Sequence, residues 1–163
     1  MISFQHINNQ FQHVFQLASE IWNDNYKGII SQNQIDYMLN MMYNPERLQQ
    51  DLEEGYQWEF ISYNNEIVGY LAYTIKNDNR VFLSKIYLKT TAQGLGIGKT
   101  ALEHVKNYAK TNNTSAVYLT VNKRNIKGMR AYQNTGFTII DEEITNIGQG
   151  YVMDDYVFEY KIT

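Results

Sequence analysis

The 163-residue chain contains no cysteine, a single proline and no long apolar run. Without cysteine it cannot form disulfides, iron–sulfur clusters, the usual cysteine-based zinc sites or a thiolate nucleophile. Its longest apolar stretches are strand-sized, well short of the roughly 18 residues that a membrane helix requires. The first residues, MISFQHI, lack the basic flank and apolar core of a signal peptide. We therefore expect a soluble, cytoplasmic protein that does not bind membranes.

Histidine is also scarce. His6, His13 and His104 are scattered and do not have the spacing of a motif such as H-E-x-x-H, so we expect no bound metal. In contrast, 44% of the residues are hydrophobic and 14% are aromatic, which is enough apolar surface to offset the conformational entropy of folding. The length fits one compact domain, residues 1–163.

Charge is unevenly distributed, although the net charge is only −3. Residues 1–84 contain four Lys or Arg and ten Asp or Glu, a balance of −6. Residues 85–130 contain nine Lys or Arg and one Asp or Glu, a balance of +8. Residues 131–163 contain one Lys or Arg and six Asp or Glu, a balance of −5. A basic middle segment indicates an anionic ligand, whereas acidic flanks would attract a cation or keep the protein soluble. The overall charge argues against nucleic-acid binding.

Hydrophobic periodicity and turn signals divide the chain into strands and helices. Strands are expected at 2–7, 56–63, 66–76, 80–88, 116–121, 137–144 and 151–162, and helices at 11–22, 32–42, 45–52, 98–112 and 125–134. Ser31 and Asn44 are expected to cap two of these helices, the second of which begins with Pro45. The order β-α-α-α-β-β-β-α-β-α-β-β predicts a mixed α/β domain.

One segment is rich in glycine. It runs Gln93-Gly94-Leu95-Gly96-Ile97-Gly98-Lys99-Thr100, between an expected strand and an expected helix. Glycine lets the backbone approach a phosphate closely, and the N–H groups of a helix start bind anions. An ordinary alternative is a tight turn without a ligand. The spacing G-x-G-x-G fits neither a Walker A loop nor the dinucleotide fingerprint G-x-G-x-x-G, which disfavours a nucleotide-binding protein.

A different pattern, Q/R-x-x-G-x-G/A, matches in full at Gln93, Gly96 and Gly98. A second block follows, in which Asn125 precedes Tyr132 by seven residues and Tyr132 precedes Gly136 by four. With these blocks and its order of elements, the sequence resembles the GNAT acetyltransferase superfamily over essentially its whole length, and its layout is similar to that of bacterial polyamine-type members. The resemblance implies a mostly antiparallel sheet of about seven strands flanked by helices, and acetyl-CoA as the cosubstrate.

The resemblance also implies which residues bind acetyl-CoA. They would be Ile86, Tyr87 and Leu88 for the pantetheine arm, then Gln93, Gly94, Leu95, Gly96, Ile97, Gly98 and Lys99 for the pyrophosphate, and Asn125 for the arm again. Positive charge around the phosphorylated end would come from Lys89, Lys99, Lys123, Arg124, Lys127 and Arg130. On local physics alone, Asn125 is equally a helix cap, and several of the basic residues are equally solvated helix faces.

The reaction that the resemblance implies is direct acetyl transfer to an amine, with Tyr132 protonating the departing CoA thiolate. Tyr132 is one of 14 tyrosines, so a packing role is an equal alternative. Many members of the family carry an acidic base on the fourth strand, but here that stretch reads Phe82-Leu83-Ser84-Lys85-Ile86. The base would then be a water relay or a carboxylate from elsewhere, such as Asp154 or Asp155.

Four acidic residues are candidates for binding the acceptor. Glu20 and Asp24 lie one helical turn apart, and Asp154 and Asp155 are neighbours in the last strand, so only one of the latter two faces a given side. With the acidic flanks, they indicate a small cationic amine such as a polyamine. Two alternatives stay open: acetylation of a protein N-terminus or lysine, and a non-catalytic acetyl-CoA sensor. The long terminal strands and many tyrosines would permit a homodimer.

Overall fold

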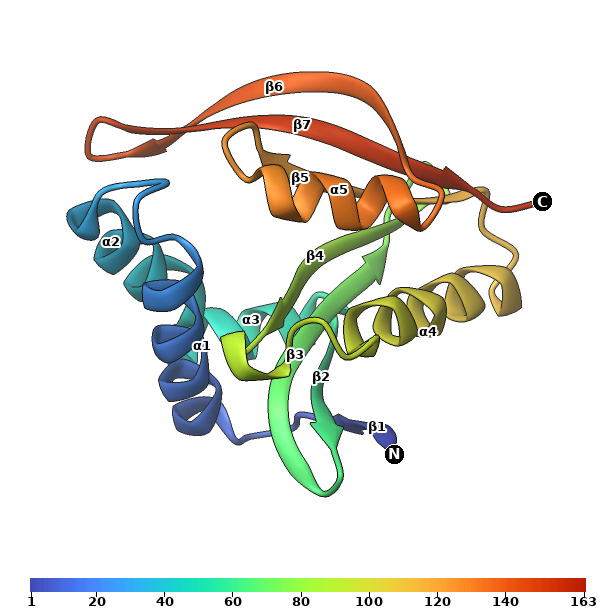
Figure 1. The fold of residues 1–163 in the computed structure, drawn as a ribbon, viewed down its shortest axis with the longest axis horizontal. Helices are drawn as coiled ribbons and strands as arrows, with labels where there is room; N and C mark the ends of the chain where they lie inside the picture. Colours follow the sequence, from blue (N-terminus) through green and yellow to red (C-terminus); the bar gives the residue numbers. More distant parts are fainter. The chain divides into compact units, whose positions relative to one another are not determined.

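The computed structural model describes residues 1–163. Its elements are β1 (Ile2–His6), α1 (Phe11–Asn25), α2 (Gln32–Tyr43), α3 (Pro45–Glu53), β2 (Gln57–Tyr63), β3 (Glu66–Ile75), β4 (Val81–Leu88), a 3-10 turn (Thr90–Ala92), α4 (Ile97–Thr111), β5 (Ala116–Asn122), α5 (Ile126–Asn134), β6 (Thr138–Gly148) and β7 (Tyr151–Lys161) (Figure 1). The strands form a seven-stranded sheet in the order β1-β2-β3-β4-β5-β7-β6. The β4–β5 pair is parallel, whereas the β1–β2, β2–β3, β5–β7 and β6–β7 pairs are antiparallel. The predicted mixed α/β fold with a mostly antiparallel sheet is confirmed.

Local signals in the sequence fix most of the element ends. Ser31 Oγ accepts a hydrogen bond from the Gln34 N–H at 3.1 Å, and Asn44 Oδ1 accepts one from the Arg47 N–H at 2.8 Å, so both predicted caps are confirmed. The 3-10 turn was not predicted, because three residues are too short to show a periodic pattern. β6 continues beyond the predicted end at 144 to Gly148, since its ladder with β7 extends past the last apolar residue of the pattern.

The chain divides into two compact units. The first comprises residues 1–74 and 85–101. Within it, α1 packs against α2 and α3 (Figure 1). The buried residues of α1 recur every three or four positions, so they form one apolar stripe: Val14, Leu17, Ala18, Ile21 and Trp22. β3 is buried on both faces from Val68 to Thr74.

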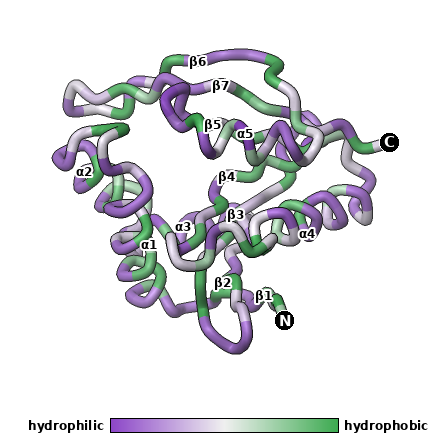
Figure 2. The backbone as a smooth tube through the Cα atoms, in the orientation of Figure 1, coloured by the Kyte–Doolittle hydropathy of each residue, from purple (hydrophilic) through white to green (hydrophobic).

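The second unit comprises residues 75–84 and 102–163. β6 and β7 form a long antiparallel hairpin, and β7 also pairs with β5. α5 lies along one face of these strands, where the ring of Tyr132 contacts Phe158 of β7 with centroids 5.9 Å apart (Figure 1). β6 is exposed along nearly its whole length, and Figure 2 shows a hydrophilic stretch in its middle. That stretch contains three consecutive acidic residues, Asp141, Glu142 and Glu143.

Candidate active site

The glycine-rich loop leads from the 3-10 turn into α4. Gly94 and Gly96 both have φ +80°, a backbone conformation that residues with a Cβ rarely adopt. A Cβ built on either glycine would meet no atom within 4 Å, so backbone conformation rather than crowding requires glycine, and the space above both residues is open. Ile97, the first residue of α4, is fully buried and anchors the loop.

The start of α4 presents backbone donors that the chain leaves unused. The first hydrogen bond of this turn joins the Thr100 N–H to the Gly96 carbonyl at 3.1 Å, and the N–H groups of Ile97, Gly98 and Lys99 have no acceptor in the chain. The first turn contains no acidic residue. Because α4 is 15 residues long, its macrodipole adds positive potential at this end. An open glycine surface with unused donors fits a phosphate group such as those of CoA.

Gln93, which precedes the loop, is bonded to the chain itself. Its Nε2 donates to the Leu88 carbonyl and to Asn25 Oδ1, both at 3.3 Å. Asn25 Nδ2 donates to the same carbonyl at 3.4 Å, and the Gln93 N–H donates to the Thr90 carbonyl at 3.3 Å. Gln93 therefore ties the loop to α1 and to the end of β4. Its predicted role in cofactor binding stays a prediction.

The end of β4 lies against β3 at a very close approach. A Cβ on Gly69 of β3 would come within 2.2 Å of the Tyr87 carbonyl oxygen and 2.8 Å of Leu88 Cδ2, so only glycine fits there. The parallel ladder between β4 and β5 ends after Phe82. The residues predicted to bind the pantetheine arm, 86–88, follow this short ladder along β4, and their role stays a prediction.

α5 carries the second predicted block. Asn125 caps the helix, because its Oδ1 accepts a hydrogen bond from the Gly128 N–H at 3.0 Å. The amide nitrogen of Asn125 has no acceptor in the chain. Tyr132 is half-buried, and its ring contacts Phe137 and Phe158 with centroid separations of 6.0 and 5.9 Å. The cap and the packing role are therefore both present, and the cap leaves the amide nitrogen of Asn125 able to donate to a ligand.

Asp155 of β7 is only 4% exposed, and its Oδ1 is shielded from solvent without a hydrogen-bond partner. Burial, together with the negative charges of Glu143 and Asp154, raises the pKa of Asp155 to about 6, although Lys123 opposes the shift. Glu143 lies directly opposite in β6, and Asn122 lies opposite in β5. Leaving a buried carboxyl group without a partner costs free energy. A ligand with a positive charge or N–H donors would satisfy it.

Asp155 and Tyr132 lie on opposite faces of the β5–β7–β6 layer. Side chains alternate along a strand, and β7 pairs with β5 without irregularity from Asp155 to Lys161. Asp155 and Phe158 therefore point to opposite faces, and Tyr132 packs on the face of Phe158. In direct transfer the amine nitrogen and the leaving sulfur bond to the same carbonyl carbon, so a base on the face opposite to Tyr132 would reach the amine proton only through a water relay.

Comparison with known proteins identifies the family. The sequence model of the Acetyltransferase (GNAT) family matches residues 14–137, well over half of the chain. The chain belongs to this family. It is similar to the spermine/spermidine N(1)-acetyltransferase of Bacillus subtilis, with 26% identity over 118 residues that cover 66% of this chain and 75% of that protein.

Solved structures of acetyltransferases have the same fold. The PaiA N-acetyltransferase from Thermoplasma acidophilum, in complex with coenzyme A, superposes with a TM-score of 0.84 at 22% identity and covers 99% of both chains. A GNAT family acetyltransferase from Elizabethkingia anophelis, with acetyl-CoA bound, gives a TM-score of 0.67 at 17% identity over 99% of this chain and 98% of that one. The match to the family model confirms the predicted family and activity: the chain is an acetyl-CoA-dependent N-acetyltransferase. No helix in this acetyltransferase is long and apolar enough to cross a membrane.

The four acidic residues predicted to bind the acceptor have different surroundings in this acetyltransferase. Glu20 Oε2 lies 3.4 Å from Lys89 Nζ, and Asp154 Oδ1 lies 3.0 Å from Lys123 Nζ, so both are already ion-paired. Asp24 is exposed and forms no ion pair. Only Asp24 and Asp155 therefore keep a carboxylate without a neighbouring cation in contact.

The same ion pairs engage two of the six basic residues predicted near the phosphates. Lys89 pairs with Glu20, and Lys123 contacts both Asp154 and Glu142, the latter at 3.4 Å. In contrast, Lys99 is exposed at the start of α4, beside the unused N–H groups. Lys99 is therefore in a position to meet an anion bound at the loop.

The surroundings of Lys85 were not predicted. This residue of β4 is 7% exposed, and its Nζ lies 5.3 Å from the ring centroid of Trp58 and 5.6 Å from that of Tyr43. Burial lowers the pKa of Lys85 to about 8, and the charge of Arg47 adds to this, whereas Asp51 opposes it. The available signal was a lysine at an inward position of an apolar strand, where a charge is rare.

Proposed function

We propose that this acetyltransferase acetylates a primary amine of a small polycationic molecule of the polyamine type. The observation that carries the proposal is the buried carboxyl group of Asp155, whose Oδ1 has no partner. An alkylammonium supplies both the positive charge and the N–H donors that this oxygen lacks. The name of the Bacillus subtilis relative, a spermine/spermidine N(1)-acetyltransferase, agrees with such an acceptor.

The charge around Asp155 favours a polycation over a monoamine. Asp141, Glu142 and Glu143 are consecutive and exposed on β6, and Lys123 is the only basic side chain in contact with any of the hairpin carboxylates near Asp155. Summed negative potential of this kind raises the local concentration of multivalent cations and speeds their association. A peptide N-terminus brings a single ammonium group and gains less from it.

Asp155 also serves, through a water relay, as the base that prepares the amine. A primary ammonium has a pKa of about 10.4, so transfer of its proton to an ordinary carboxylate is strongly uphill. The pKa of Asp155 is raised from 3.8 to about 6. This narrows the gap by roughly two units, worth on the order of 3 kcal/mol in proton transfer. Asp155 stays ionised at neutral pH and can therefore accept the proton.

The remaining roles follow the predicted residues. Acetyl-CoA supplies the acetyl group as a thioester. The N–H groups of Ile97, Gly98 and Lys99 bind its phosphates, and the amide nitrogen of Asn125 donates to the pantetheine arm. The hydroxyl of Tyr132 donates a proton to the leaving sulfur, since a phenol O–H is a hydrogen-bond donor that can act as a general acid.

Thiol release from acetyl-CoA, measured with a panel of acceptors, tests the proposal. The panel contains spermidine, spermine, 1,3-diaminopropane, propylamine, amino acids and short peptides, and CoA binding is measured in parallel. We expect the highest kcat/KM with the polyamines. Turnover confined to peptides would replace the polyamine with a protein acceptor. Tight CoA binding without turnover of any amine would favour the sensor.

A further inference from the structure

Lys106 of α4 is a buried charged residue to which the proposed reaction assigns no role. It is only 7% exposed. Its Nζ donates to the Thr135 carbonyl at 2.6 Å and to Glu103 Oε1 at 3.3 Å, and it lies 3.9 Å from the ring centroid of Tyr160. Three partners match the three N–H donors of an ammonium group. The ammonium of Lys106 is therefore held in one place, as a buried charge requires.

The Thr135 carbonyl lies at the C-terminal end of α5, where Thr135 is the capping residue. The last carbonyls of a helix lack partners within the helix, and they form the negative end of its macrodipole, where a cation is favoured. The last turn of α5 contains no basic residue of its own. Lys106 supplies the positive charge instead, so a side chain of α4 caps α5.

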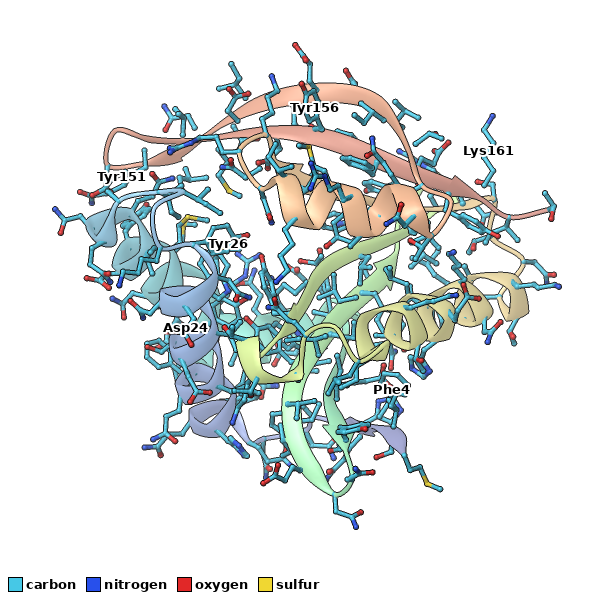
Figure 3. All side chains as sticks on the ribbon, viewed as in Figure 1. Phe4, Asp24, Tyr26, Tyr151, Tyr156 and Lys161 are labelled. Carbon is cyan, nitrogen blue, oxygen red and sulfur yellow. The ribbon has the colours of Figure 1, made fainter.

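α5 is not anchored by buried side chains. None of its nine residues is buried, in contrast to α1, which buries an apolar stripe. β7 runs past α5, and Tyr151, Tyr156 and Lys161 mark the course of this strand in Figure 3. Most helices in proteins are held by the packing of an apolar face. The position of α5 therefore depends more than usual on the contacts at its two ends, the Asn125 cap and Lys106.

The turn that Lys106 holds is bonded directly to Tyr132. The Tyr132 carbonyl accepts hydrogen bonds from the N–H groups of Thr135 and Phe137, both at 3.1 Å, and from Thr135 Oγ1 at 2.9 Å. The Phe137 ring is buried and contacts the Tyr132 ring. Lys106 Nζ lies 5.4 Å from the ring centroid of Phe137. Lys106 therefore reaches Tyr132 by two routes, one through the backbone and one through the rings.

We propose that Lys106 is a positioning residue for acetyl transfer: it holds the C-terminal end of α5 and so fixes the place of the Tyr132 hydroxyl. A general acid must lie within hydrogen-bond reach of the atom that it protonates, and a misplacement of about 1 Å can cost on the order of 100-fold in rate. Lys106 acts only through Tyr132, and no step of the reaction uses its own ammonium. This inference rests on the role proposed above for Tyr132.

Steady-state kinetics with acetyl-CoA and spermidine tests the positioning role. Lys106→Met keeps most of the side chain and removes the ammonium, so it should lower kcat by about tenfold and change the KM for acetyl-CoA by less than about twofold. Lys110→Met, at an exposed position one turn further along α4, is the matched control and should keep the wild-type kcat. Lys106→Gln keeps N–H donors without the charge, should show a smaller loss, and replaces Lys106→Met if that protein does not fold. An unchanged kcat overturns the inference and leaves the proposed function standing.

The double variant Lys106→Met/Tyr132→Phe separates positioning from a general loss of structure. Without the hydroxyl no acid is left to misplace, so adding Lys106→Met to Tyr132→Phe should change kcat by less than about twofold. An equal loss in both backgrounds would overturn the inference, because Lys106 would then act independently of Tyr132. A wild-type kcat in Tyr132→Phe alone gives a different result, since it removes the proposed acid whatever Lys106→Met does.

Amide hydrogen exchange tests the hold of Lys106 on α5 without any acceptor. In Lys106→Met, the N–H groups of Thr135 and Phe137 should exchange at least about tenfold faster than in the wild type, whereas those of the β5–β7 ladder should keep their rates. Wild-type exchange at both positions would overturn the inference. If exchange is faster there but no amine is acetylated, the proposed function fails and the hold of Lys106 on α5 stands.

Discussion

Glu143 and Asp155 lie directly opposite each other in the antiparallel ladder of β6 and β7. Directly paired residues share a face of the sheet, so the two carboxyl groups are held as neighbours by the backbone itself. Burial of Asp155 is the larger cause of its raised pKa, and the charge of Glu143 adds to it. The hairpin therefore holds two neighbouring carboxyl groups, and a bound cation would reduce the repulsion between them.

The pH dependence of catalysis should follow the ionisation of Asp155. The kcat/KM for an amine should fall below about pH 6 in the wild-type enzyme, because protonated Asp155 cannot accept a proton. Asp155→Asn should lose about 10²- to 10⁴-fold in kcat/KM and should lose this acidic limb. The control is Asp154→Asn, an exposed and ion-paired neighbour, which should stay within about threefold of wild type. Persistence of the limb in Asp155→Asn would contradict the role.

The Asp155→Asn substitution should also stabilise the fold at neutral pH. The folded-state pKa of Asp155, about 6, lies above its unfolded value of 3.8, so the native state binds more protons between these values. The contribution of Asp155 to stability is therefore largest below pH 3.8 and is lost as the pH rises through 6. Asp155→Asn should be more stable than wild type at pH 7 by up to about 3 kcal/mol, and should show no advantage near pH 3.5, by urea denaturation.

Two glycine substitutions separate phosphate binding from loop geometry. A Cβ on Gly98 would meet only Leu88 Cδ1 at an ordinary 3.7 Å, so Gly98→Ala should keep or raise the Tm. If the backbone of Gly98 approaches a phosphate closely, the same variant should weaken CoA binding by tenfold or more, by calorimetry. Gly96→Ala should instead cost about 1 kcal/mol, because φ +80° is strained for alanine. Wild-type CoA affinity in a stable Gly98→Ala protein would leave the loop as a turn without a ligand.

Tyr132→Phe removes one hydroxyl and keeps the ring that packs on Phe137 and Phe158. We expect kcat to fall by about 10²-fold or more, with little change in Tm or in CoA affinity, since the hydroxyl acts on the leaving sulfur rather than in binding. Stopped-flow thiol release and calorimetry with CoA measure the two effects. A kcat within twofold of wild type would show that Tyr132 is a packing residue only.

Lys85 should make stability depend on pH in the alkaline range. Its folded-state pKa of about 8 lies below its unfolded value of 10.5, so the unfolded state binds more protons between these values. Stability of the wild type should therefore rise with pH from about 8 to 10.5. Lys85→Met keeps most of the volume and removes the buried charge, so it should be more stable than wild type at pH 7 by up to about 3 kcal/mol, with the difference vanishing above pH 10.5. A less stable Lys85→Met at pH 7 would show that the contacts of the ammonium outweigh its burial.

Short-range signals allowed most of the fold to be predicted. The caps at Ser31 and Asn44, the apolar stripe of α1 and the glycine spacing at residues 93–98 all act within a few residues, so each can be recognised from the sequence. These local signals predicted the order of the elements. The family was also predictable from the sequence, because both of its motif blocks are short segments, one in the loop before α4 and one in α5.

The tertiary structure decided what the side chains of the site do. Asp154 and Asp155 are identical and adjacent in the sequence, yet one is exposed and paired with Lys123 and the other is buried without a partner for Oδ1. The sequence by itself determined that only one of them could face a given side, since side chains alternate along a strand. Which one became buried depended on the register of β7 with β5 and β6, and the surroundings of Lys85 depended on rings from α2 and β2. Burial and charge come from elements far apart in the chain, and only the folded protein brings them together.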